Sequence, residues 1–186
     1  MSRFLSKASE SLVPYTPGEQ PQGRKFIKLN TNECPYPPSP KVAEAILAGY
    51  EENSSKIMPL ELANLRLYSD PEERVLIEAI ADHYGVGTNQ VIAGNGSDEI
   101  LGFAFRAFCD QNAPLQFADL TYGFYPALCG LYGIPFKVVP LEEDFTLNIE
   151  PYKNCGNNVI IANPNAPTGM NLPLSAIEEV AASNPD

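Results

Sequence analysis

The sequence has little histidine and no closely spaced pair of cysteines, and these shortages argue against a metal site. Its 186 residues include one histidine, His83, and four cysteines. The cysteines are Cys34, Cys109, Cys129 and Cys155. They are too far apart for a CxxC metal site, and a chain of this length does not need disulfide bonds to fold. We therefore expect no metal and four reduced thiols. His83 precedes Gly85 in the predicted last turn of a helix, a favourable place for an imidazole without catalysis.

Long apolar stretches and clusters of basic residues are also missing. No apolar run reaches 18 residues, so no membrane helix is predicted. The N-terminus lacks the charged segment and following apolar segment of a signal peptide, so none is predicted either. The formal net charge is -11, with no run of lysine or arginine, which argues against nucleic acid as a partner. Together with the four reduced thiols, these features predict a cytoplasmic protein.

The predicted organisation is an N-terminal arm followed by an α/β domain. Residues 1–38 are rich in proline and glycine and read as an irregular arm, while residues 39–186 alternate between helical and strand patterns. Strands are predicted at Gln90–Ala93, Leu115–Ala118, Phe136–Val139 and Val159–Ala162. Helices are predicted after the cap Ser39-Pro40, after a capping box at Asp70, at Ser97–Cys109, at Gly123–Tyr132, and after a capping box at Ser175. Repeated βα units predict a three-layer sandwich, with helices on both faces of a largely parallel sheet.

Three loops at the carboxyl ends of these strands have unusual sequences, and ligands of such sheets bind at this edge. In Gly94-Asn95-Gly96-Ser97-Asp98-Glu99, the backbone N–H groups of Ser97 and Asp98 would point out of a helix N-terminus towards an anion such as phosphate. The same residues could form only an ordinary serine-capped helix.

The other two loops contain aromatic rings and amides. Asp119-Leu120-Thr121-Tyr122-Gly123 places Tyr122 where its ring could lie flat against a heterocycle, or could only pack the start of a helix. The stretch "NPNAPTG", residues 163–169, is stiffened by two prolines and would hold Asn163 or Asn165 in place, with or without a ligand. Taken together, the three loops describe a pocket for a flat, phosphorylated aromatic ring.

Five motifs in order resemble the pyridoxal-phosphate-dependent aminotransferases of fold type I, class I/II, and among these the histidinol-phosphate aminotransferases. They are "LNTNECPY" at 29–36, "LYSDP" at 67–71, "GNGSDE" at 94–99, "TYGFY" at 121–125 and "NPNAPTG" at 163–169. Each motif is weak by itself, but their order and spacing together make a specific signal. The resemblance implies a pyridoxal 5'-phosphate cofactor and transfer of an amino group from histidinol phosphate to 2-oxoglutarate.

The resemblance also implies roles for individual residues. Ser97 and Asp98 would bind the cofactor phosphate, and Tyr122 would stack on the pyridine ring. Tyr68 would reach the phosphate in the neighbouring subunit, which implies a homodimer with shared sites. Two further residues, Tyr15 and Asn32, would lie near the substrate.

One position departs from the family pattern. The family usually has an amide immediately before Pro-Thr-Gly, to hydrogen-bond the phenolic oxygen of the ring, and here that residue is Ala166. Asn165, one residue earlier, is the nearest substitute.

The resemblance places the lysine of the Schiff base beyond residue 186, so no catalytic residue is assigned in this chain. The sequence is then the first part of the cofactor domain, without its second half and the small C-terminal domain, and is expected to be inactive alone. Two related activities share these motifs, those of an aromatic amino acid aminotransferase and of a threonine-phosphate decarboxylase. A binding or regulatory module with a relict phosphate loop is the alternative outside enzymes.

Overall fold

The computed structural model describes residues 27, 29, 33–44, 68 and 70–185, which form two compact units. The first unit contains the described residues up to Ala93, and the second begins at Gly94. Most of the predicted arm lies outside the described residues. No helix in the described part of the chain is both long and apolar enough to cross a membrane.

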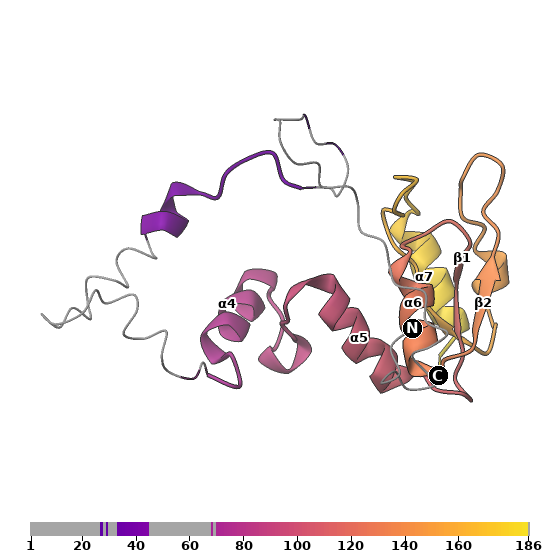
Figure 1. Ribbon diagram of the computed structural model, residues 1–186, viewed down its shortest axis with the longest axis horizontal. Helices are drawn as coiled ribbons and strands as arrows, with labels where there is room; N and C mark the ends of the chain where they lie inside the picture. Colours follow the sequence, from indigo (N-terminus) through magenta and orange to yellow (C-terminus); the bar gives the residue numbers. More distant parts are fainter. Residues whose placement is uncertain (1–26, 28, 30–32, 45–67, 69, 186) are drawn as a thin grey trace, which may run out of the picture. The chain divides into compact units, whose positions relative to one another are not determined.

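Within the described residues, the first unit contains a helical segment at residues 40–44, the helix α4 at Arg74–Tyr84 and a 3-10 turn, η1, at Thr88–Gln90 (Figure 1). The prediction that α4 follows directly on Asp70 is wrong. The Asp70 carboxylate accepts hydrogen bonds from the N–H groups of Glu72 and Arg74, at 3.1 and 3.2 Å, and so closes a separate turn. Glu73 then has a left-handed φ of 48°, which separates this turn from the helix.

The C-terminus of α4 agrees with the prediction. His83 lies in its last turn, and Gly85 caps it with φ 67°, a conformation that favours glycine. The predicted strand Gln90–Ala93 does not form. Gln90 ends η1, and within the described residues no strand pairs with residues 91–93. A strand requires a neighbour for its backbone hydrogen bonds, and local sequence cannot supply one.

The second unit is built on a parallel three-stranded sheet in the order β2-β1-β3. The strands β1, Leu115–Ala118, and β2, Phe136–Val139, have the predicted bounds. The strand β3 covers only Asn158–Val159, although the N–H of Ile160 still donates to the carbonyl of Gln116 at 3.1 Å. The predicted extension of this strand to Ala162 is therefore too long.

Three helices accompany the sheet: α5 at Gly96–Phe108, α6 at Phe124–Tyr132 and α7 at Leu174–Ser183. A 3-10 turn, η2, at Glu150–Tyr152 precedes β3. The predicted capping box at Ser175 does not form, because α7 begins earlier. Its N-cap is Pro173, whose extended backbone starts the helix without a side-chain cap.

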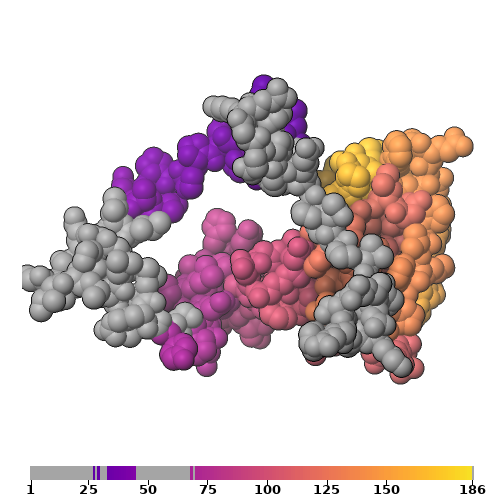
Figure 2. Space-filling model, viewed as in Figure 1, coloured from indigo at the N-terminus to yellow at the C-terminus, as the bar shows by residue number. Residues whose placement is uncertain are grey.

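The helices cover both faces of the sheet and bury a core on each, as the predicted three-layer sandwich requires. On one face, Phe105 of α5 and Leu128 of α6 pack against Leu115 and Phe117 of β1. On the other face, Val180 of α7 packs against residues of β2, η2 and β3. The orange and yellow segments, which include β2 and α7, pack directly against one another in the space-filling view (Figure 2).

The four cysteines are free in the structure. Cys129 belongs to the core between α6 and the sheet, and burial raises the pKa of its thiol to about 11. The thiol is therefore neutral at physiological pH and packs as a small apolar group.

Candidate functional site

The candidate site lies at the carboxyl edge of the sheet, where the second unit brings three loops together. The loop after β1 leads into α6, and the loop after β3 contains residues 163–169 and leads into α7. The third element is the N-terminus of α5 with the glycines that precede it. Hydrogen bonds between side chains join these elements, so the three motifs lie next to one another as the sequence predicted.

The two glycines at the start of α5, Gly94 and Gly96, are needed for different structural reasons. At Gly94, a Cβ would come within 2.8 Å of the Cδ1 of Ile100, so the end of that side chain would have to shift to admit a larger residue. At Gly96 there is open space, but φ is +80°, a backbone conformation that side chains disfavour. Together they allow a sharp turn directly into the first turn of α5.

The N-terminus of α5 leaves two backbone N–H groups available. The N–H of Asn95 donates to the Oε2 atom of Glu99 at 2.6 Å, and the N–H of Gly96 donates to the carbonyl of Gly94 at 3.0 Å. The N–H groups of Ser97 and Asp98 donate to no other group in the described part of the chain, and both residues are exposed. The first turn of a helix cannot satisfy such groups internally, so these two can bind an anion.

The charge of this turn opposes an anion. Asp98 and Glu99 both lie in the first turn of α5. They stabilise the helix dipole, yet they also repel a phosphate. We therefore expect a cationic group from elsewhere to complete any phosphate site here.

Tyr122 is held against the start of α5. Its hydroxyl donates to the Oδ1 atom of Asp98 at 2.7 Å. Its ring meets Tyr125 edge-on, with centroids 5.7 Å apart and an angle of 88° between the planes. The side chain is only half-buried, so a fixed aromatic surface lies next to the free N–H groups of Ser97 and Asp98.

Asn165 is buried, with 6% of its surface exposed. Its Nδ2 group donates to the carbonyl of Leu120 at 2.9 Å and to the hydroxyl of Thr168 at 3.2 Å. Its Oδ1 atom accepts the hydroxyl proton of Thr121 at 2.7 Å. The side chain thus joins the loop after β3 to the loop after β1.

The loop that contains "NPNAPTG" is closed on itself by further hydrogen bonds. The side-chain amide of Asn163 accepts from the N–H of Leu172 at 2.9 Å and donates to the carbonyl of the same residue at 3.2 Å. The N–H of Asn165 donates to the carbonyl of Met170 at 2.8 Å. The stiff turn expected from the two prolines is therefore also stiffened by hydrogen bonds.

Three residues of this network were missed in the sequence. Thr121 and Thr168 bond the amide of Asn165, as described above. Asp119 follows β1, and its Oδ1 atom accepts from the N–H groups of Leu120 and Leu141, at 2.7 and 3.0 Å. Hydroxyl and carboxylate groups in the loops after the strands were the available signal, because such groups commonly bond loop backbones.

The other predicted site residues are Tyr68, Tyr15 and Asn32. Tyr68 belongs to the first unit and is fully exposed. Tyr15 and Asn32 lie outside the described residues.

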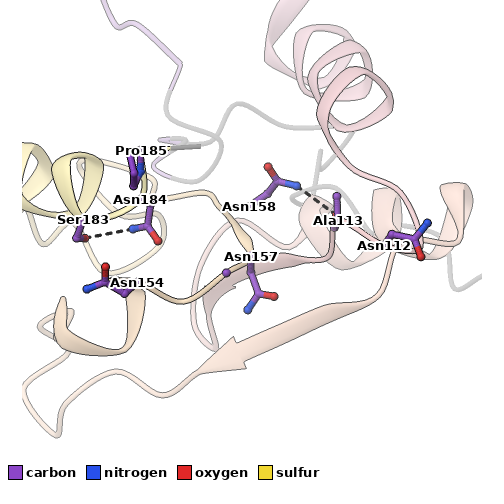
Figure 3. A pocket seen from close by; sticks show the side chains of 9 residues that line it. Asn112, Ala113, Asn154, Asn157, Asn158, Ser183, Asn184 and Pro185 are labelled. Carbon is purple, nitrogen blue, oxygen red and sulfur yellow. Dashed lines mark hydrogen bonds between the residues drawn. The ribbon is translucent and has the colours of Figure 1, made fainter.

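A second hollow lies at the opposite, amino edge of the sheet and is lined by asparagines (Figure 3). The side-chain amides of three of these asparagines already bond other parts of the protein. Asn158 donates to the carbonyls of Phe108 and Ala113, at 2.9 and 3.2 Å, and Asn157 donates to the Oε1 atom of Gln116 at 3.0 Å. Asn184 bonds the backbone of Tyr152 at 2.8 Å. These bonds explain Asn157, Asn158 and Asn184 without a ligand.

The fold and the carboxyl-edge loops define an α/β domain of the class that binds its ligand beyond the ends of parallel strands. Within that class, the chain belongs to the aminotransferase class I and II family, whose model matches residues 24–185.

The chain is similar to other proteins along its whole length. It is 48% identical over 186 residues to a histidinol-phosphate aminotransferase of Pseudomonas putida (strain W619), and 49% identical over 187 residues to histidinol-phosphate aminotransferase 1 of Methylococcus capsulatus. A crystal structure of histidinol-phosphate aminotransferase from Sinorhizobium meliloti in complex with pyridoxal-5'-phosphate has the same fold, with a TM-score of 0.76 at 24% identity. That similarity covers 98% of this chain and 48% of the crystallised one. The chain spans about half the length of the curated relatives it matches, 50% of the Pseudomonas protein and 49% of the Methylococcus protein.

Proposed function

We propose that this chain is the first part of a pyridoxal-phosphate-dependent histidinol-phosphate aminotransferase of histidine biosynthesis. The full-length enzyme would transfer the amino group of histidinol phosphate to 2-oxoglutarate and release imidazole acetol phosphate and glutamate. The fixed ring of Tyr122 beside the free N–H groups of α5 supports the cofactor. The names of relatives that are 48–49% identical support the substrate.

Each residue at the carboxyl edge has a role in this proposal. The N–H groups of Ser97 and Asp98 bind the cofactor phosphate, and Tyr122 stacks on the pyridine ring. When bound, the cofactor supplies an electron sink for breaking bonds at the α-carbon of the amino donor. The sequence-based role of Asn165 is a hydrogen bond to the phenolic oxygen of the ring. Both of its side-chain N–H groups already donate hydrogen bonds within the protein, so this contact would require one of those bonds to break.

The proposal also covers the domain organisation, the substrate residues and the assembly of the full-length protein. Residues 1–38 form the arm, and residues 39–186 the first part of the cofactor domain, with Tyr15 and Asn32 near the substrate. The enzyme is a cytoplasmic homodimer with shared active sites. The cation that offsets the carboxylates of α5 comes from the rest of the chain or from the partner subunit.

The test is a substrate comparison with the full-length protein encoded by the gene. We expect glutamate formation from histidinol phosphate and 2-oxoglutarate, dependent on added pyridoxal phosphate. Phenylalanine and threonine phosphate are the matched alternative substrates. Activity on phenylalanine alone would identify an aromatic amino acid aminotransferase, and carbon dioxide from threonine phosphate would identify a decarboxylase. No cofactor binding and no turnover would favour a binding module.

Replacing Tyr68 by phenylalanine tests the shared site. If its hydroxyl reaches a cofactor phosphate in the partner subunit, Tyr68→Phe in the full-length enzyme weakens cofactor binding by about 0.5–1.5 kcal/mol, or up to about 3 kcal/mol because the acceptor is charged. Equilibrium titration of the cofactor-free enzyme measures this. Tyr84, also exposed and in the same unit, provides the control Tyr84→Phe, which should bind like wild type. Equal affinity for all three proteins would remove this role from Tyr68.

A further inference from the structure

We propose that Asn165 is a positioning residue, which holds the loop of Tyr122 in place instead of binding the cofactor ring directly. This inference rests on the proposed function, because it concerns how the ring-stacking residue is fixed. It assigns to Asn165 a task different from that of the amide that usually precedes Pro-Thr-Gly in the family.

The hydrogen-bonding capacity of the side chain supports this assignment. An asparagine amide has two N–H donors and one carbonyl oxygen. In Asn165 one donor reaches the carbonyl of Leu120, the other reaches the hydroxyl of Thr168, and the oxygen accepts from Thr121. No N–H remains for an oxyanion. Because the side chain is buried, each bond that was given up would leave an unsatisfied polar group.

The backbone of Asn165 is held as firmly as its side chain. Its N–H donates to the carbonyl of Met170 at 2.8 Å, and its carbonyl accepts from the N–H of Gly169 at 2.7 Å. The hydroxyl of Thr168, which receives the amide, also accepts from the N–H of Met170 at 3.3 Å. Rotating the amide towards a ligand would therefore break a connected set of hydrogen bonds.

The partners of Asn165 lie directly before the stacking residue. Leu120 and Thr121 are the two residues that precede Tyr122, and they lie 45 and 44 positions from Asn165 in the sequence. Tyr122 itself is anchored at its other end by Asp98. The backbone before the ring and the hydroxyl at its tip are thus held from two different elements, which fixes the plane of the ring before any ligand arrives.

Position 166 fits the same interpretation. Ala166 has no polar side chain, and the amide of Asn163 is turned to the backbone of Leu172. The residues of this loop thus serve to hold loops together, and Asn165 is the one that reaches the loop of Tyr122.

The test compares Asn165→Ala, the near-isosteric Thr121→Val and the double variant in the full-length protein. If Asn165 acts through the Tyr122 loop, Asn165→Ala raises the dissociation constant for pyridoxal phosphate about 5- to 30-fold. Thr121→Val raises it about fivefold. The double variant should resemble Asn165→Ala alone, because both substitutions remove one shared connection. Asn163→Ala is the matched control: it alters the same loop but should show no such coupling with Thr121→Val.

A second measurement separates positioning from direct contact. The visible absorption of the bound cofactor is titrated with pH in each variant. A positioning residue leaves the midpoint of this titration unchanged in both single variants. A midpoint that moves in Asn165→Ala but not in Thr121→Val, or affinities that multiply in the double variant, would overturn the proposal.

The result also distinguishes this inference from the proposed function. If the wild-type protein retains no pyridoxal phosphate, the proposed function fails. Urea unfolding of the cofactor-free variants then still decides whether Thr121 and Asn165 are coupled. Additive losses of stability in that experiment would show that the two residues do not act together.

Discussion

Phe117→Ala is expected to lower the free energy of unfolding by about 3–5 kcal/mol, the usual cost of removing a buried aromatic ring. Phe117 lies in β1, the central strand, with 2% of its surface exposed. Its ring stacks on Phe136 of β2 with centroids 5.2 Å apart, and meets Tyr125 of α6 at 5.7 Å. Alanine would leave a cavity where two strands and a helix meet. Urea denaturation followed by circular dichroism measures the change.

Phe108→Ala is the control for this substitution. Phe108 ends α5 and is 72% exposed, so the same chemical change should alter stability by no more than about 0.5 kcal/mol. Similar losses in the two variants would mean that the core is not centred on β1. A loss limited to Phe117→Ala is the expected result.

Gln116→Leu is expected to cost about 2–4 kcal/mol, although leucine has nearly the same volume and is more apolar. Gln116 is completely buried next to Phe117 in β1. Its amide donates to the carbonyl of Pro151 at 2.7 Å and accepts from the side chain of Asn157 at 3.0 Å. Leucine would leave both groups, which are partly buried, without these partners.

Two comparisons isolate this effect in the same denaturation experiment. Gln111→Leu changes an exposed glutamine in the turn before β1 and should be nearly neutral. Asn157→Ala removes one of the two groups orphaned by Gln116→Leu, so the double variant should cost less than the sum of the single ones. An additive double variant, or a stabilising Gln116→Leu, would show that these hydrogen bonds do not matter for stability.

The elements that were predicted well are those that depend on local side-chain patterns. The bounds of β1 and β2 match the prediction, and α5 and α6 are within one residue of theirs. Their apolar residues recur with the period of a helix or a strand, which is the signal that local sequence supplies. Helices were expected on both faces of the sheet because a parallel sheet is buried on both faces. The helix starts at Asp70 and Ser175 were predicted less well. At Asp70 the carboxylate closes a separate turn before the helix, and at Ser175 the helix begins earlier, after Pro173.

The sequence by itself determined the class of fold and the edge of the sheet where the three loops meet, and it predicted Ser97, Asp98, Tyr122 and Asn165 as candidate site residues there. Glycines, prolines and the ends of strands restrict the backbone locally, so these conclusions could be drawn without knowing any contact between distant residues. Only the tertiary structure decided what the side chains do there. The hydroxyl of Tyr122 bonds Asp98, which is 24 residues away, and the amide of Asn165 bonds Thr121, which is 44 residues away. A hydrogen bond between residues so distant in the sequence exists only after the strands have paired and brought their loops to one edge. For the same reason residues 91–93 did not form the predicted strand, because a strand depends on a neighbour that its own residues do not specify.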